Sequence, residues 1–328
     1  MVRRAATAKD VAHLAGVSRA TVSYVVNDNP NQRISPETRE RVLAAVAELG
    51  YTPSATARAL RKGAGDVVLL ALPNGPLGPT LTQFIETLEA ELARVGVGVV
   101  TRRVVDGQPM TALWRPFMPA AVVGLTAISA ADARELRAAG VFVAQAMLAT
   151  APDEATMSVP QTLIGRLQVE HLASRGHRVL GYAEDSRTGM TDFLSLRRDG
   201  VRQACVELGL DLPVAVPIAL DAEDGARAVT LLRAAGCTAV CAYNDEVAFV
   251  VLAGMRLLGL TAPADLAVIG VDDIPLAPFA CPPLTTVNQN IPLVSRHLAA
   301  LLRAGISGEP LPAMPRSESL TLVVRESA

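Results

Sequence analysis

Residues 8–27 constrain the fold most, because this segment combines two capped helices with one glycine turn between them. Thr7 is placed to cap the first helix with Asp10 as its capping-box partner, and Gly16 supplies the sharp turn. Ser18 is placed to cap the second helix. The segment therefore has the outline of a helix-turn-helix.

Apolar side chains of the segment recur at helical spacing, which predicts one shared core for the two helices. The expected core residues are Val11, Leu14, Val17, Val22 and Val25. The opposite face is free to meet the major groove of DNA. With the cap, the predicted DNA-reading residues are Ser18, Arg19, Ala20, Thr21, Ser23, Tyr24 and Asn27.

A third helix follows, with Ser35 as its cap, Pro36 in its first position and Gly50 as its stop. Its expected apolar row is Val42, Leu43, Val46 and Leu49. Three short helices make a small, complete DNA-binding head.

Residues 51–62 form a second candidate DNA-binding segment, in which Pro53 makes a rigid break after the third helix. Small residues such as Ala57 allow close approach to a narrow minor groove, Leu60 can wedge between base steps, and Arg61 can pair with phosphates. So short a helix is marginal in water unless a partner stabilises it. A plain interdomain linker with an accidental leucine is the alternative.

Charge is distributed unevenly along the chain. Residues 1–65 hold ten Lys or Arg against five Asp or Glu, although the whole chain has a net charge of -2. The basic excess therefore lies on the DNA-binding head and hinge, and the remainder is acidic.

From Asp66 the pattern changes to short apolar runs alternating with helical stretches. Such runs predict buried parallel strands with helices between them. The eight runs lie at 67–73, 95–100, 120–126, 141–147, 178–184, 214–220, 238–243 and 266–271. Eight such strands are more than one doubly wound sheet of this length is expected to hold. A break near 158–160 therefore predicts two doubly wound α/β lobes that face each other across a cleft.

These segments together resemble the LacI/GalR family of bacterial transcription regulators. The resemblance rests on KDVAHLAGVSRATVSYVVN at 9–27, SPETRERVLAAVAELGYTPS at 35–54 and ARALR at 57–61. It continues in TAVCAYNDEVAF at 238–249, in the stretch 258–289 and in the terminal LVVRESA. Residues 66–160 match much less well.

The resemblance implies a helix-turn-helix head, a hinge helix and a two-lobed core like that of periplasmic binding proteins. The expected domains are a head at 1–50, a hinge at 51–65 and a core at 66–328. Because the family's chain crosses between lobes three times, lobe one is expected at 66–159 and about 288–316, and lobe two at 160–287 and about 317–328.

The resemblance also implies a cytoplasmic, nucleoid-associated repressor that binds a near-palindromic operator in double-stranded DNA as a homodimer. A small-molecule effector in the interlobe cleft would change the lobe angle and so the folding of the paired hinges on DNA. The family's tetramer-forming tail is not seen after RESA, so a dimer is expected. Weakened effector control is the alternative function.

Four polar residues are the expected effector contacts, since ligands of open α/β sheets bind beyond the carboxyl ends of strands. By resemblance they are Arg197, Asn244, Asp272 and Gln289. Asn244 is equally placed as a helix cap, and Arg197 could instead be a solvated helix arginine. Asp273 is expected to point away from Asp272, because adjacent strand residues face opposite sides.

Several departures from the family pattern concern specificity. LPNGPLGPTLTQF at 72–84 and SVPQT at 158–162 replace stretches that often contact sugars, and Pro160 removes an acceptor. In the head, Tyr24 stands where most members have Arg, which can make a two-pronged contact to guanine. We expect an atypical operator, with Arg19 taking over part of the guanine reading.

Other classes of protein find little support. There is no GxSxG, GxxxxGK or His-rich spacing, so no catalytic residue, cofactor or metal site is predicted. The four cysteines lack paired metal spacing, and no apolar run approaches the ~20 residues of a membrane helix. A free-standing solute-binding protein would need a secretion signal and would have no use for the head.

Overall fold

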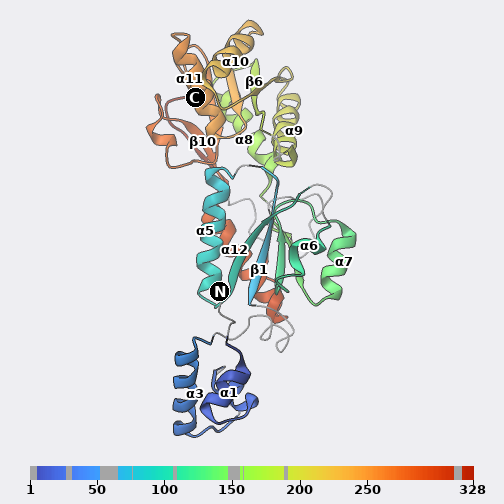
Figure 1. The fold of residues 1–328 in the computed structure, drawn as a ribbon. Coiled ribbons are helices and arrows are strands. Elements are labelled where there is room, and N and C mark those ends of the chain that lie inside the picture. The colour runs from blue at the N-terminus through green and yellow to red at the C-terminus, as the bar shows by residue number, and fades with distance from the viewer. Residues whose placement is uncertain are drawn as a thin grey trace. The chain divides into compact units, whose positions relative to one another are not determined.

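The computed structural model of the chain describes residues 6–26, 32–51, 66–75, 77–105, 109–146, 156–157, 159–187, 191–313 and 320–328. The chain packs as two units, Met1–Asp66 and Val67–Ala328. The first unit is the head and the second is the two-lobed core (Figure 1).

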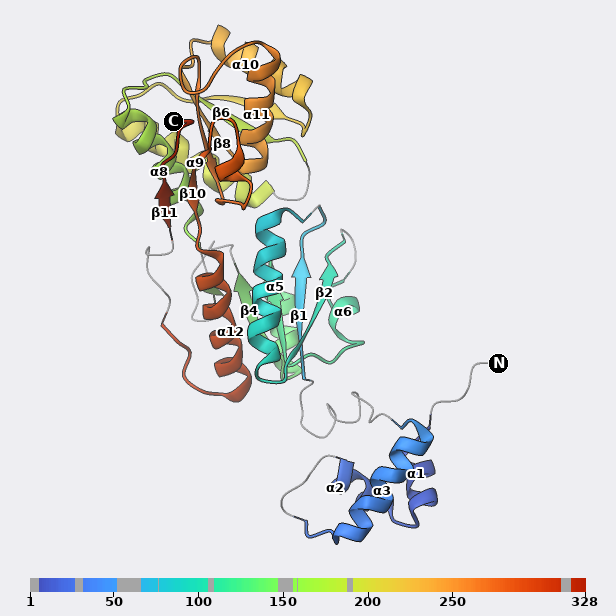
Figure 2. The same ribbon diagram turned by 90° about the vertical axis from the view of Figure 1, so that its left-hand side faces the viewer.

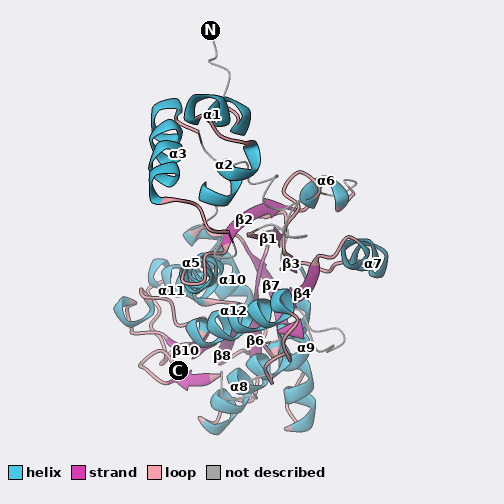
Figure 3. Cartoon of the chain, turned by 90° about the horizontal axis from the view of Figure 1, so that it is seen from below, coloured by secondary structure: helices cyan, strands magenta, loops and turns pink. Residues whose placement is uncertain are grey.

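The head consists of helices α1 (Ala8–Ala15), α2 (Arg19–Val26) and α3 (Pro36–Leu49), which surround one small core (Figure 3). Thr7 and Asp10 form the predicted capping box of α1. Gly16 and Gly50 end α1 and α3 at φ of 66° and 60°, the left-handed region that glycine enters without steric strain.

The head core differs from the prediction in three positions. Leu14, Leu43 and Leu49 are exposed, so their expected burial is wrong. Alanines and valines fill the centre instead, and the buried set is Val11, Ala12, Ala15, Val22, Val25, Val42 and Ala45. Small side chains let short helices approach closely, and the larger leucines project from the rim.

Lobe one of the core contains a five-stranded parallel sheet in the order β2-β1-β3-β4-β5. Its strands are β1 (Val67–Leu72), β2 (Gly98–Arg103), β3 (Ala121–Gly124), β4 (Phe142–Ala146) and β5 (Thr156–Met157). The alternate residues of β1 pack on both faces: Val68 and Leu70 against a core shared with α5 (Pro79–Ala93), and Leu69 against the α6 (Thr111–Trp114) and α7 (Ala130–Ala138) side. Helix α12 (Ile291–Ser307) joins α5 on the first face (Figure 2).

Lobe two contains a six-stranded sheet in the order β11-β10-β9-β8-β6-β7. Its strands are β6 (Leu180–Asp185), β7 (Val214–Ile218), β8 (Ala239–Ala242), β9 (Ala267–Val271), β10 (Thr285–Asn288) and β11 (Thr321–Val323). Only β11 is antiparallel to its neighbour. The helices are α8 (Gln161–Ser174), α9 (Thr191–Glu207), α10 (Ala222–Ala234), α11 (Asp245–Leu257) and the short 3-10 turn η1 (Ala277–Phe279).

Each of the eight predicted apolar runs overlaps a strand, and three further strands were not predicted. These are β5, β10 and β11, which have only two to four residues each. The chain leaves the second sheet at β10, forms α12 on lobe one, and returns as β11 beside β10. Gln289 follows β10 directly and precedes α12, so it lies at the second of the three passages between the lobes.

Within the described part of the chain, no helix is both long enough and apolar enough to cross a membrane.

Candidate functional site

The predicted reading face of α2 is available to a partner. Ser18 Oγ accepts a hydrogen bond from the backbone N–H of Thr21 at 3.1 Å, so Ser18 caps the helix as predicted. Arg19 and Ala20 are exposed, while Ser23 and Tyr24 are half-buried. Of the predicted DNA contacts, Asn27, Ala57, Leu60 and Arg61 lie outside the described residues.

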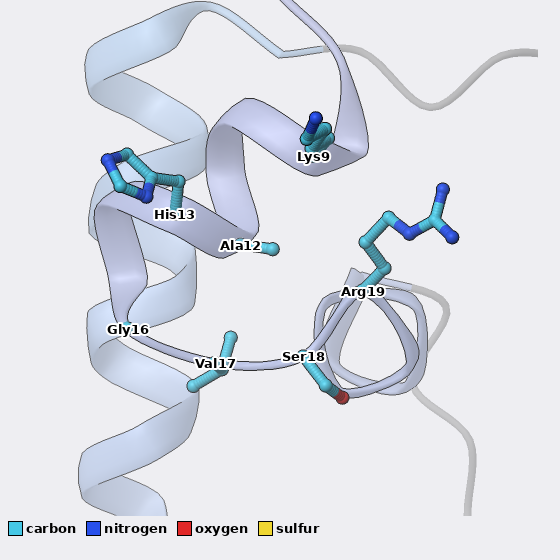
Figure 4. Close-up of a pocket in the computed structure, with 7 residues that line it drawn as sticks. All are labelled: Lys9, Ala12, His13, Gly16, Val17, Ser18 and Arg19. Carbon is cyan, nitrogen blue, oxygen red and sulfur yellow. The ribbon is translucent and has the colours of Figure 1, made fainter.

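A groove of about 720 Å³ lies between α1 and the start of α2 (Figure 4). Its lining residues are Lys9, Ala12, His13, Gly16, Val17, Ser18 and Arg19. In Figure 4 the side chains of Lys9 and Arg19 lie toward the same side of the view, whereas the Ser18 hydroxyl points away from both. Lys9 and His13 were missed by the sequence prediction, although an exposed cation on the first helix of such a motif suits contact with the DNA backbone.

The Arg197 side chain is buried in lobe two, with only 5% of the residue exposed. Its Nε donates to Gln161 Oε1 at 2.7 Å, and its Nη1 donates to the carbonyl of Tyr243 at 2.7 Å. Nη2 lies 3.7 Å from Asp272 Oδ1, and the guanidinium stacks over the Tyr243 ring at 4.7 Å. The alternative of a solvated helix arginine is wrong.

Asp272 and Gln289 complete this cluster. Gln289 is fully buried; its Nε2 donates to Asp272 Oδ1, and its Oε1 accepts from Gln161 Nε2 at 3.3 Å. Burial raises the pKa of Asp272, and the Arg197 charge opposes that rise. We call Arg197, Gln161, Asp272 and Gln289 the Arg197 network.

Two glycines explain why Arg197 reaches Gln161. A Cβ at Gly165 of α8 would lie 2.3 Å from the Arg197 carbonyl, and a Cβ at Gly200 of α9 would lie 2.1 Å from the Thr162 carbonyl. The backbones of α8 and α9 therefore meet at a distance that only glycine permits at both positions. This contact holds Arg197 beside the first residue of α8.

Gln161 was missed by the sequence prediction. It follows Pro160 at the first crossing between the lobes, and its residue is 3% exposed. Because this crossing segment departs from the family pattern, only its position could have indicated a role. The structure brings Gln161 and Gln289, 128 residues apart, into one hydrogen bond.

Asn244 caps α11 and is not one of the four residues of the Arg197 network. Its Oδ1 accepts from the backbone N–H of Val247 at 2.9 Å, which is the helix-cap alternative. The next residue, Asp245, is fully buried and accepts from Thr286 Oγ1 at 2.6 Å and from the Ile274 N–H at 2.9 Å. Burial raises the pKa of Asp245 to about 7.

Asp272 and Asp273 have separate partners, but not for the predicted reason. Strand β9 ends at Val271, and both aspartates have positive φ, 114° and 53°. Asp273 pairs with Arg325 at 2.6 Å and accepts from Asn288 at 2.9 Å. Both nevertheless line one cavity of about 400 Å³, so the predicted opposite orientation does not keep them apart.

That cavity spans the junction of the two lobes. Lobe one contributes Gln83 of α5 and the start of α12, and lobe two contributes both aspartates. The lining residues are Gln83, Asp272, Asp273, Asn288, Asn290, Ile291, Pro292, Thr321 and Val323. Most of them carry amide, carboxylate or hydroxyl groups, which suits a polar occupant.

Metal ligation has no structural basis among the described residues, where no three His, Cys, Asp or Glu side chains gather to hold an ion. All four cysteines are free, and three are buried. Burial holds the pKa of the Cys241 thiol well above its usual range, which keeps it protonated and unreactive.

Two family models match the chain. Residues 7–54 match the model described as bacterial regulatory proteins, lacI family, and residues 169–328 match a periplasmic binding protein-like domain. The transcriptional regulator MalR of Streptomyces coelicolor is 32% identical over 97% of this chain and 95% of its own length. The ribose operon repressor of Escherichia coli is 32% identical over 87% of this chain and 88% of its own.

Solved structures agree. The lac repressor dimer bound to operator and the anti-inducer ONPF aligns with a TM-score of 0.79 at 24% identity, covering 99% of both chains. The CelR–cellobiose complex aligns with a TM-score of 0.67 at 27% identity, covering 98% of this chain and 100% of that one. The helix-turn-helix head and the two-lobed binding-protein-like core are thus the fold of these regulators. With regulators matched over nearly its whole length, the chain belongs to the LacI family of bacterial regulatory proteins and is a DNA-binding transcriptional regulator rather than an enzyme.

Proposed function

We propose that the protein is a cytoplasmic repressor that binds a near-palindromic operator as a homodimer and responds to a small-molecule effector. The observation that carries this proposal is that one chain has both exposed residues on the predicted reading face of α2 and, in its core, a buried polar network between two lobes. One head reads one half-site, so twofold symmetry of the protein matches twofold symmetry of the operator. Its target is chromosomal DNA, which would place it on the nucleoid.

The head residues divide into two roles under this proposal. Arg19, Ala20, Ser23 and Tyr24 meet base edges, together with Asn27. Ser18 and Thr21, which already bond to each other, fix the start of α2 and contact the backbone. Arg19 and Tyr24 are the longest of these side chains, and the Ser23 hydroxyl and the Asn27 amide add further polar contacts to bases.

The hinge at 51–65 is the second DNA contact that we propose. Leu60 enters the central minor-groove step, Ala57 permits the close approach, and Arg61 pairs with phosphate. Replacing Leu60 by Gly is expected to reduce operator affinity and bending while the dimer remains intact. Normal bending of operator DNA by that variant would refute the wedge.

The effector site is proposed at the junction of lobe one (66–159 and about 288–316) with lobe two (160–287 and about 317–328). Arg197, Asp272 and Gln289 are its polar contacts. Asn244 is the fourth proposed contact, and its Oδ1 also caps α11. The relatives include a ribose operon repressor and a CelR–cellobiose complex, so a sugar is the class to test first.

A second candidate function is regulation with weakened effector control. Gln161 supplies Arg197 with the acceptor that an effector would otherwise supply, at 2.7 Å. An effector must displace this amide before it reaches the guanidinium, and that requirement lowers its apparent affinity.

Selection of genomic DNA fragments by the purified full-length chain tests the proposal. The expected result is enrichment of one near-palindromic sequence, bound as a dimer in sedimentation analysis. Enrichment without sequence preference would refute operator recognition. Sugars that are substrates of the proteins encoded by the neighbouring genes would then be tested for release of the operator. If none of them released it, weakened effector control would be favoured.

A further inference from the structure

Among the described residues, the arginines at the lobe-two side of the junction are paired with carboxylates. Arg187 holds Asp185 at 2.6 Å and Glu246 at 3.0 Å. Arg198 lies 3.1 Å from Glu184, and Arg197 lies 3.7 Å from Asp272. With Arg325, which pairs with Asp273 at 2.6 Å, five carboxylates face four guanidinium groups among the described residues, so this edge of the sheet carries an excess of negative charge.

Lobe one brings the positive end of a helix to the same place. Helix α5 begins after Gly78, whose position provides no side-chain cap, and Pro79 has no backbone N–H. A Cβ at Gly78 would lie 3.4 Å from Glu246 Oε2 of lobe two. Thr80, two residues after Gly78, hydrogen-bonds Asp272.

Glu246 is thus shared between two positive groups. It is bound by the Arg187 guanidinium on its own lobe, and it lies next to the start of α5 on the other. Its side chain is 25% exposed, so it is open to the junction. Both groups are ones that a phosphate or carboxylate ligand would use.

Arg103 is the cation at this junction with no carboxylate partner among the described residues. It lies at the end of β2, at the carboxyl edge of the lobe-one sheet. Its Nη1 donates to the carbonyls of Pro73 and Gly75, so it is engaged in holding the loop after β1.

We propose that Glu246 excludes anionic effectors, so that the junction selects an uncharged, hydroxyl-rich ligand over its phosphorylated or carboxylated counterpart. This inference rests on the proposed effector site and narrows the chemical class that the site accepts. An incoming phosphate would have to displace Glu246 from Arg187 while it approached Asp185 and Asp272. An uncharged polyol can instead donate hydroxyls to these carboxylates.

Binding of inorganic phosphate to the full-length chain tests the exclusion without knowledge of the effector. Thermal unfolding would be followed by the fluorescence of Trp114, the only tryptophan, which is buried in lobe one and reports on the core rather than the head. Phosphate and chloride would be compared at equal ionic strength, because general screening then cancels. Wild type is expected to show no phosphate-specific rise in midpoint.

Glu246→Gln is expected to gain a phosphate-specific rise, because Arg187 and the start of α5 become available to the anion. Asp185→Asn, which releases Arg187 from its other partner, is expected to gain a smaller rise and serves if the first variant folds poorly. Adding Arg187→Met to Glu246→Gln should abolish the gain. Glu309→Gln, beyond the end of α12, makes the same change in net charge and should behave as wild type.

A phosphate-specific rise in wild type, or no gain in either charge-removal variant, would overturn the exclusion. Operator selection is a separate readout, so the regulator proposal can fail while the phosphate result stands. Conversely, an operator-binding protein whose wild-type core binds phosphate would refute only the selectivity.

Discussion

The head and the lobe junction use their polar residues in opposite ways. On α2 the predicted contacts are exposed or half-buried, and their surroundings leave them open to a partner. At the junction, Arg197, Gln161 and Gln289 are each at most 5% exposed and satisfy one another. A reading surface can therefore be changed one residue at a time, whereas the junction responds to substitution as a unit.

The largest expected effect follows from breaking the junction network. Arg197→Met leaves Asp272 as a buried carboxylate without its cation, and should lower the free energy of unfolding by about 3–5 kcal/mol. Arg198→Met, its sequence neighbour, breaks only a partly exposed pair with Glu184 and should cost less than about 1 kcal/mol. Denaturant unfolding of both variants measures the contrast, and equal losses would show that Arg197 is not special.

A pH-dependent loss of stability is expected next, from Asp245. Burial raises its folded pKa to about 7, above the unfolded value, so the folded chain holds this proton more tightly. The stability contribution is present below about pH 4 and is lost as pH rises through about 7. The shift corresponds to an upper bound of about 4 kcal/mol.

Asp245→Asn is the matched variant, since an amide keeps the shape and can still accept from Thr286 or Ile274. The difference in unfolding free energy between wild type and variant should fall between pH 4 and 7. Buried histidines such as His171 have lowered pKa values and act in both proteins alike, so they cancel from the difference. A difference that does not change with pH would contradict the buried, protonated carboxyl.

The features that were predicted correctly from the sequence are those that depend on local interactions. The capping box of Thr7 and Asp10, the stop at Gly50 and the apolar runs of the sheets depend on neighbours a few residues apart. Gln161 and its bond to Gln289 depend on the passage of the chain between lobes, which no local pattern encodes. Glu246 lies in the first turn of α11, and its partner Arg187 is 59 residues away, so no local pattern indicates their ion pair.

The prediction of the head core was wrong for a different reason. Helical spacing marks a face, but it does not say how deep each residue of that face lies. Leu14 is 45% exposed, whereas Ala12 and Ala15 are buried, because three short helices close on small side chains. How deeply a side chain is buried depends on the distance between the helices, which helical spacing in the sequence does not indicate.

A pair of head variants sharpens this point. Val22→Ala removes methyl groups from the centre of the head and should lower its stability by about 2 kcal/mol. Leu14→Ala removes a larger side chain from the rim and should change stability by less than about 0.5 kcal/mol. Both would be measured on the isolated unfolding transition of the head by circular dichroism. A greater loss for Leu14→Ala would restore the predicted core.

The smallest expected energy concerns base readout by Tyr24. A phenol offers one hydroxyl and an apolar ring edge, whereas arginine can bond guanine at two points, so Tyr24→Arg should shift base preference at one operator position by about 1 kcal/mol or more. Stability should not change, because Tyr24 is half-buried at the rim of the small core rather than inside it. Selection from a randomised operator pool gives the measurement, with Lys9→Gln as the control that weakens all sequences alike and flattens the salt dependence. Identical base profiles for wild type and Tyr24→Arg would show that Tyr24 does not read bases. The contrast between a head whose residues act independently and a junction whose residues act together would then lose this support.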